Sequence, residues 1–392
     1  MGSYRRSALH RWAAVALSLA AFTGCAVSPG AATLGADQEP FINGADNRLD
    51  YFQLQNVDER AAMQSFAVAL MPLVNAQALV SGEVDQIPSW GQLNDLCADE
   101  PFRDQPSASF CSGVLVDWDL VLTSGHCMDL VPLEALRVVL GYYYTAPGQL
   151  ALSSSDVYSA AEVVASRRDP SSYEQRLDFA WLRLNGLVQA PHHPAAVYRR
   201  SPGPSLGDPI ISISAGGGIP LKLDDGAHVQ ETRETTGDYF VADTDTSEGS
   251  SGGGAFAPDL ALLGTLARGA PDFVQQDSTC QVSDKSQNPN EAREQFTYLY
   301  RSIQDLCEVE PQRWLCDAQC AEPCLPPSAP LDPPSSADAN CAIGAWGAGR
   351  TRAVLPLFCA VASLRRRRKR AERTGSAARD CGSEAEAPHI SS

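Results

Sequence analysis

The segment from Phe110 to Cys127 constrains this chain more than any other stretch. It reads Phe-Cys-Ser-Gly-Val-Leu-Val-Asp-Trp-Asp-Leu-Val-Leu-Thr-Ser-Gly-His-Cys, which indicates a strand, a tight turn, a second strand and then a histidine followed directly by a cysteine. Cys111 and Cys127 lie sixteen positions apart. A bridge between them would hold His126 at the end of its strand, which is a place suited to proton transfer.

Two later motifs supply the partners that such a histidine needs. Asp178 opens the apolar run Asp-Phe-Ala-Trp-Leu-Arg-Leu, and Ser251 lies in the glycine-rich turn Gly-Ser-Ser-Gly-Gly-Gly. A serine hydroxyl needs a base to become a nucleophile, a neutral imidazole can be that base, and a buried carboxylate fixes the imidazole tautomer. The glycines around Ser251 leave the amides of Gly249 and Ser251 free to bind a developing oxyanion.

Together these motifs resemble the chymotrypsin-like serine peptidases, and most closely the bacterial branch typified by staphylococcal glutamyl endopeptidase. The order His126, Asp178, Ser251, with spacings of 52 and 73 positions, supports the resemblance, which covers roughly residues 57–305. It implies an all-β fold of two six-stranded antiparallel β-barrels, with His126 as base, Asp178 as its orienting group, Ser251 as nucleophile, and no cofactor. The matching pieces are residues 111–116, 122–127, 178–184 and 249–253.

One departure bears on activation. Animal trypsins carry an aspartate directly before the nucleophile, and it pairs with a new N-terminal amine, whereas this chain has Ser250 there. The amine-to-carboxylate switch is therefore not supported.

The residues before Ser251 bear on substrate choice. Asp245 stands six positions before the serine, where trypsin-like enzymes place the floor of the S1 pocket, and it would favour Arg or Lys through charge pairing. Thr246, five positions before the serine, matches a threonine of glutamyl endopeptidases. Those enzymes also use a histidine where this chain has Leu266, which argues against glutamate. We therefore assign Asp245 and Thr246 to substrate binding and expect a basic P1 residue.

Composition narrows the class further. The chain has 392 residues, with 30 Lys and Arg against 47 Asp and Glu, and the net charge of −17 disfavours a nucleic-acid partner. Short Val, Ile and Leu runs between Gly and Pro turns favour antiparallel barrels, and the apolar spacing of Phe296–Leu306 predicts a closing helix. His192 and His193 lie between prolines and are expected as solvated loop residues.

The N-terminus predicts export. Residues 1–25 have a basic start and an eleven-residue apolar core, Trp12 to Phe22, that is too short to span a membrane. Phe-Thr-Gly-Cys at 22–25 resembles a lipoprotein cleavage site, which would make Cys25 the lipidated first residue. Ordinary signal-peptide cleavage near Ala26–Ala32 is the alternative. Residues 26–56 are interpreted as a spacer or pro-segment, followed by the peptidase domain at 57–306.

The C-terminal part is rich in cysteine and proline. We interpret residues 307–340 as a cap and linker, in which Cys316, Cys320 and Cys324 either staple the cap or bind zinc; export favours the staple. Cys111–Cys127 is the one pairing that we assign. Residues 341–370 contain a cysteine, an apolar run and an arginine cluster, and resemble the sorting tails of myxobacterial surface proteins, with a disordered tail as the alternative; residues 371–392 are expected to be disordered.

These observations predict an exported, monomeric serine endopeptidase that acts on proteins or peptides, without cofactor, metal or nucleic acid, and with membrane or cell-surface anchoring through its termini. Two alternatives from other classes stay open. One is a catalytically silent barrel that serves as a surface binding module. The other is a zinc-binding surface module built on Cys316 to Cys324.

Overall fold

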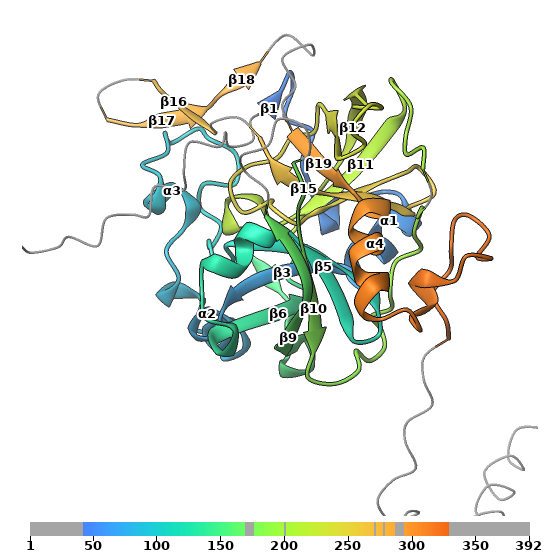
Figure 1. Ribbon diagram of the computed structural model, residues 1–392. Coiled ribbons are helices and arrows are strands. Elements are labelled where there is room, and N and C mark those ends of the chain that lie inside the picture. Colours follow the sequence, from blue (N-terminus) through green and yellow to red (C-terminus); the bar gives the residue numbers. More distant parts are fainter. Residues whose placement is uncertain are drawn as a thin grey trace, which may run out of the picture. The chain divides into compact units, whose positions relative to one another are not determined.

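The protein consists of two closed six-stranded antiparallel barrels and a C-terminal helix (Figure 1). The computed structural model describes residues 42–168, 176–199, 201–269, 272–276, 279–286 and 294–328. The predicted fold class, two antiparallel barrels of the chymotrypsin type, is confirmed. The strand order explains how each barrel closes.

The first barrel follows the order β10-β5-β4-β3-β6-β9. Its strands are β3 (Ala67–Pro72), β4 (Cys111–Asp117), β5 (Leu120–Thr123), β6 (Leu136–Leu140), β9 (Val157–Arg168) and β10 (Asp178–Leu184). Every residue of β4 and β5 is buried, as expected for apolar, β-branched sequences in a barrel wall. The tight turn predicted between them lies at Trp118 and Asp119.

The second barrel follows the order β11-β14-β15-β19-β13-β12 and closes through pairing of β11 with β12. Its strands are β11 (Pro209–Ser214), β12 (Lys222–Glu231), β13 (Tyr239–Ala242), β14 (Gly254–Phe256), β15 (Leu262–Arg268) and β19 (Glu294–Tyr298). Stacked rings of Phe240 and Phe296, with centroids 5.3 Å apart, fill part of its core.

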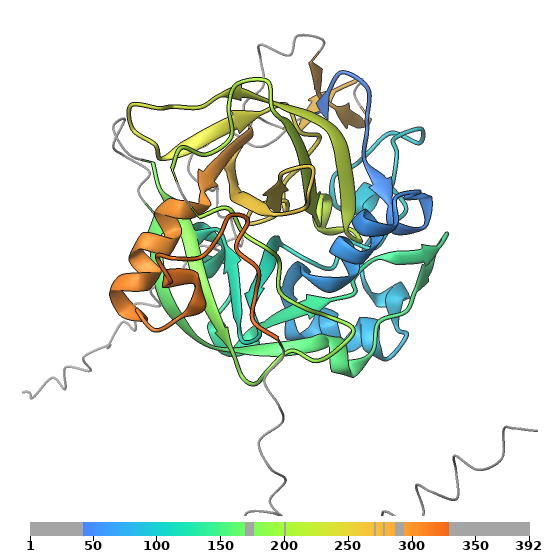
Figure 2. The same ribbon diagram turned by 90° about the vertical axis from the view of Figure 1, so that its right-hand side faces the viewer.

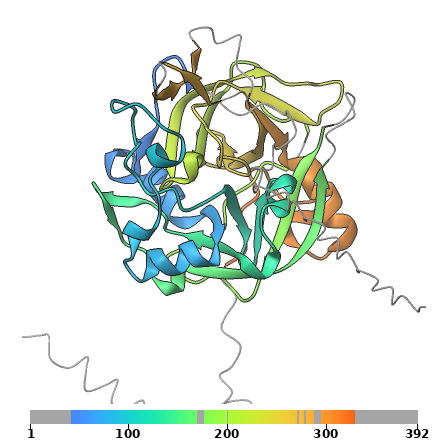
Figure 3. The ribbon, with the colours of Figure 1, turned by 90° about the vertical axis from the view of Figure 1, so that its left-hand side faces the viewer.

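The segment before the first barrel is part of the folded domain. Strand β2 (Leu49–Asp50) pairs with β12. The Asp50 carboxylate forms a buried ion pair with Lys222, in which Nζ lies 2.9 Å from Oδ1. Leu54 is fully buried. Part of the segment predicted as a spacer or pro-segment, residues 42–56, is thus joined to the second barrel by the pairing of β2 with β12 (Figure 3).

A long insertion joins β3 to β4 and was not anticipated from the sequence. It carries the helices α2 (Leu73–Val80) and α3 (Trp90–Leu93), and the Cys97–Cys280 disulfide ties it to the second barrel's loop. That loop holds the hairpin β16 (Phe273–Gln275) and β17 (Gln281–Ser283). The other short elements are α1 (Val57–Ser65), β1 (Ile42–Asn43) paired with β18 (Lys285–Ser286), and β7 (Tyr144–Ala146) paired with β8 (Gln149–Leu150).

Helix α4 (Leu299–Val309) follows β19 and packs against β9 of the first barrel and β15 of the second (Figure 2). Its buried face consists of Leu299, Ser302, Ile303 and Leu306, at the spacing of one helical face. The predicted helix began at Phe296, but that residue lies in β19 because its side chain completes the barrel core. Disulfides Cys307–Cys316 and Cys320–Cys324 follow the helix, so these cysteines staple the cap and do not bind zinc.

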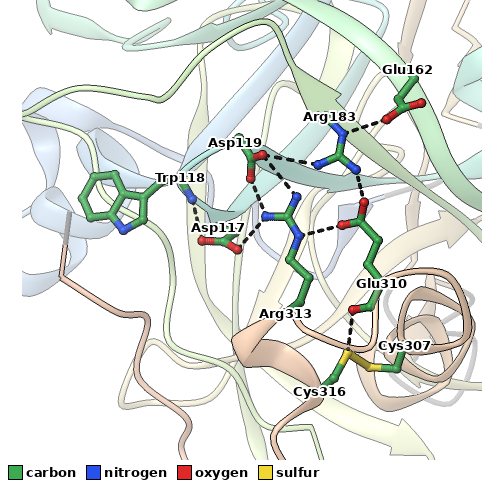
Figure 4. A network of polar contacts seen from close by, with 9 residues as sticks. All are labelled: Asp117, Trp118, Asp119, Glu162, Arg183, Cys307, Glu310, Arg313 and Cys316. Atoms are coloured by element: carbon green, nitrogen blue, oxygen red, sulfur yellow. Dashed lines mark hydrogen bonds and ion pairs between the residues drawn. A yellow bond between two sulfur atoms is a disulfide. The ribbon is translucent and has the colours of Figure 1, made fainter. Parts of the chain in front are cut away.

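An arginine network attaches this cap to the first barrel (Figure 4). The Arg313 guanidinium donates to Asp117 at 2.8 Å, to Asp119 at 2.5 Å and to Glu310 at 2.6 Å, and Arg183 joins Asp119 to Glu310. Burial would raise the pKa of Asp119, but the hydrogen bond and charge of Arg313 hold it below its ordinary value. Through Arg313 the cap thus forms ion pairs with the β4–β5 turn that precedes the histidine motif.

His192 and His193 were both expected to be solvated loop residues. His193 is exposed as predicted, but His192 is buried, because its Nδ1 lies 2.7 Å from the Gln64 carbonyl and its Nε2 lies 2.9 Å from Asp156 Oδ1. Within the described residues no helix has the length and apolar character to cross a lipid bilayer. The predicted signal peptide with Cys25, the sorting tail at 341–370 and the tail at 371–392 lie outside the described residues.

Candidate active site

A hydrogen bond joins His126 to Asp178 at the edge of the first barrel. His126 lies in the 3-10 turn η3 (Gly125–Asp129) directly after β5, and Asp178 opens β10, which pairs with β5. His126 Nδ1 lies 2.8 Å from Asp178 Oδ2, and the His126 backbone amide donates to Oδ1 at 3.1 Å. Because an ionised carboxylate only accepts hydrogen bonds, Nδ1 carries the proton and Nε2 is left to act as a base.

The Asp178 carboxylate is buried, with 4% of the residue exposed, yet it stays acidic. Burial alone would raise its pKa, but the hydrogen bond and charge of His126 and the charge of Arg268 hold the pKa below its ordinary value. Arg268 Nη2 lies 4.0 Å from Asp178 Oδ2. Thr297 on β19 donates its hydroxyl to the Asp178 carbonyl at 3.0 Å, so the second barrel also positions this residue.

A disulfide between Cys111 and Cys127 fixes the histidine turn to β4. The assigned pairing is therefore present in the structure. Donor atoms of Cys111, His126 and Cys127 lie within 4.8 Å of one another, a spacing that would suit a metal ion. Since both sulfur atoms are spent in the disulfide, this trio lacks the thiolates that a metal site would need.

Ser251 lies in a sharp turn before β14 that only this glycine pattern allows. Gly249 has φ +93° and Gly252 has φ +84°, in the left-handed region that favours glycine. A Cβ atom at Gly252 would also come within 2.3 Å of the Ser112 carbonyl. The glycines two before and one after the serine are therefore both required by the backbone.

The backbone amides of Gly249 and Ser251 are both available to bind a ligand. Within the described part of the chain neither amide donates a hydrogen bond, whereas Ser250, Gly252 and Gly253 all donate to backbone carbonyls. The Glu248 carbonyl accepts from the Gly217 amide at 2.5 Å, so the next amide, that of Gly249, points the opposite way across its trans peptide. Two such amides can bind an oxyanion.

Sequence reasoning missed several serines that hold this turn. Ser112 on β4 donates its amide to the Ser251 carbonyl and its hydroxyl to the Gly249 carbonyl, both at 2.8 Å. The Ser250 hydroxyl accepts from Ser214 Oγ at 2.9 Å and from the Ser247 amide at 3.1 Å. Ser112 stands next to Cys111 in the opening motif, but only the barrel-to-barrel contact shows what it does.

His126, Gly249 and Ser251 line one cleft of ≈ 390 Å³ between the two barrels. Its other walls come from both barrels and from the insertion between β3 and β4, which contributes Trp90, Leu93 and Asn94. Glu248, Asp272 and Phe273 line its second-barrel side. The sequence predicted that His126, Gly249 and Ser251 share one site but not the insertion that shapes the cleft.

The two residues assigned to substrate binding lie elsewhere. Asp245 is 3% exposed, its Oδ2 accepts from the Asn47 amide at 2.6 Å, and it is not among the residues that line the cleft. Thr246 is buried and lines a smaller cavity behind the cleft. The structure therefore does not support Asp245 as an accessible pocket floor, because the N-terminal segment covers its carboxylate.

Comparisons with known proteins give a family match for this region and a similarity to a solved structure. Residues 111–264 match the family model described as a trypsin-like peptidase domain, and this range contains His126, Asp178, Gly249 and Ser251. Among solved structures, the chain is similar to the inactive form of Rv3671c from Mycobacterium tuberculosis, a serine-to-alanine mutant. That alignment has 15% identity and a TM-score of 0.37, and covers 69% of this chain and 98% of that one. No curated protein matches the chain.

Proposed function

We propose that this protein is a serine endopeptidase that hydrolyses peptide bonds through an acyl-enzyme. The observation that carries the proposal is the 2.8 Å bond from His126 Nδ1 to a buried Asp178, at a cleft that also holds Ser251 and two unengaged amides. Each of these parts has a role in acyl transfer, and their coincidence in one cleft is more specific than any one of them.

The proposed steps are those of acyl transfer by a serine nucleophile. His126 Nε2 takes the proton of the Ser251 hydroxyl as its oxygen attacks the scissile carbonyl, and the amides of Gly249 and Ser251 bind the resulting oxyanion. His126 then protonates the leaving amine, which releases the first product and leaves an ester on Ser251. A water molecule, deprotonated by His126, hydrolyses that ester. Asp178 holds the tautomer and stabilises the imidazolium in both halves.

Export is part of the proposal. Its support is the predicted signal sequence together with four disulfides among the described residues, a pattern typical of oxidising compartments. Lipidation at Cys25 and surface sorting through residues 341–370 remain predictions from the sequence. The closer resemblance to the staphylococcal branch likewise rests on the motifs alone.

The buried Asp245 carboxylate does not support the predicted preference for a basic P1 residue, because the N-terminal segment at Asn47 covers it. Glu248 and Asp272 are the acidic residues that line the cleft, and both lie on its second-barrel side.

Labelling with a fluorophosphonate probe tests the proposed function. The purified, oxidised protein should form an adduct on Ser251, identified by peptide mapping, and Ser251→Ala should lose the adduct and at least about 10⁴-fold of peptidase activity. His126→Ala should also fail to label. A folded protein that does not label at Ser251 would contradict the proposal and favour the binding-module alternative.

A further inference from the structure

A small cavity lies directly behind the cleft. The two share Trp90, Asp272 and Phe273 as walls. Thr246 and Ser247 also line the cavity, and the chain runs from them through Glu248 and Gly249 to Ser251. The cavity therefore adjoins the end of the cleft that is nearest to the candidate oxyanion amides. Its remaining space, ≈ 160 Å³, has no part wide enough for a water molecule.

The side chain of Arg48 fills this region. Arg48 precedes β2, and its side chain is only 4% exposed. Its Nε and Nη2 each donate to one carboxylate oxygen of Asp46 at 2.8 Å. The guanidinium carbon lies 5.5 Å from the ring centre of Trp90 and 5.2 Å from that of Phe102, so two aromatic rings hold it in place.

The positive charge of Arg48 also interacts with the acidic residues behind the cleft. Burial would lower the pKa of the guanidinium, but the hydrogen bond and charge of Asp46 and the charges of Asp245 and Asp272 raise it. The neighbouring Asn47 amide donates to Asp245. The acids that would attract a basic substrate side chain therefore face a cation from their own chain.

Two hydroxyl groups that line the cavity are able to form further hydrogen bonds. Thr246 Oγ1 and Ser247 Oγ are buried and have no hydrogen-bond partner within the described residues. Buried polar groups are normally paired, so unpaired ones in a cavity that adjoins the cleft are places where a ligand group can bind. Arg48 also lines the cavity, but it forms no hydrogen bond with either hydroxyl.

We propose that Arg48 determines P1 specificity: it fills the space behind Trp90 and Phe273, and so limits the P1 side chain to short, uncharged residues. This inference rests on the proposed peptidase function. Removing Arg48 would deepen the pocket and take away the cation that faces Asp245 and Asp272. The pocket would then accept a long basic side chain.

Peptide substrates that differ only at P1 test the idea on the full chain. The wild-type protein should cleave after Ala or Ser better than after Arg or Lys. In Arg48→Ala the ratio of kcat/KM for Arg over Ala should rise at least tenfold. Arg48→Met, which keeps an unbranched apolar stem but loses the guanidinium and its charge, should raise the ratio less than Arg48→Ala. Ser81→Ala, at an exposed residue that lines neither the cleft nor the cavity, should leave the ratio unchanged.

Benzamidine, a mimic of an arginine side chain, gives a readout that does not need catalysis. Calorimetry should show at least tenfold tighter benzamidine binding to Arg48→Ala than to the wild-type protein. Unchanged binding and an unchanged P1 ratio in both folded Arg48 variants would overturn the inference, as would a wild-type preference for Arg. Probe labelling of Ser251 reports separately on the proposed function, so the two failures are distinguishable.

Discussion

The first barrel holds His126 through a disulfide and a charged hydrogen bond, whereas neutral hydrogen bonds hold the second-barrel turn that carries Ser251, among them one from Ser112 of the first barrel. The histidine side depends on one strong pair, Nδ1 to Asp178. The serine side spreads its support over Ser112, Ser214 and Ser250. Loss of a charged partner is expected to cost more than loss of one neutral hydrogen bond, so the two halves should differ in sensitivity.

The largest effect is expected at the charged pair. Asp178→Asn should lower kcat/KM by about 10⁴-fold without unfolding the protein, because an amide NH₂ facing Nδ1 would favour the tautomer in which Nε2 carries the proton. Steady-state kinetics and the rate of probe labelling at Ser251 should fall together.

The structure contains a matched control for that variant. Asp156 pairs with the buried His192 at 2.9 Å, away from the cleft. Asp156→Asn should leave kcat/KM unchanged within about a factor of two. Equal losses in both variants would mean that the effect comes from folding and not from the proposed catalytic role.

A smaller effect is expected on the serine side. Ser250→Ala removes the acceptor of two buried hydrogen bonds and should lower the free energy of unfolding by about 2 kcal/mol. We expect kcat to fall about tenfold with little change in KM, since the turn that carries Ser251 and the amides loosens. Urea unfolding and kinetics measure the two quantities, with Ser81→Ala as control. A kcat loss as large as that of Asp178→Asn would remove the contrast between the barrels.

The last effect concerns stability and not catalysis, at the N-terminal strand on the second barrel. Burial lowers the pKa of Lys222 to about 8 despite the charge of Asp50, against 10.5 for an ordinary lysine. Between these values the unfolded chain binds more protons at this site, so its contribution makes stability rise with pH, by at most about 1.4 kcal/mol per pH unit. Below pH 8 the contribution is constant and unfavourable.

Unfolding free energies measured between pH 8 and pH 9.5 test this sign. The slope should be less positive in the double variant Asp50→Asn with Lys222→Met, and unchanged in Lys285→Met, which alters an exposed lysine. A double variant with the wild-type slope would show that Lys222 keeps an ordinary pKa.

The motifs around His126, Asp178 and Ser251 could be found in the sequence because each is local. A strand that ends in histidine, an aspartate that opens an apolar run and a glycine-flanked serine all follow from short-range backbone geometry. The pairing of Cys111 with Cys127 and the antiparallel strands were predictable for the same reason, since tight turns and strand composition are properties of neighbouring residues. That the strands form two barrels of six was implied by the family resemblance of the motifs.

The sequence by itself thus determined the barrels and the candidate chemistry, whereas the tertiary structure decided what surrounds them. Arg48 lies 203 positions before Ser251 and reaches the back of the cleft only because β2 pairs with β12. Trp90 comes from an insertion that the Cys97–Cys280 bridge ties to the other barrel. Such contacts depend on pairing between distant segments, which leaves no periodic signal in the chain.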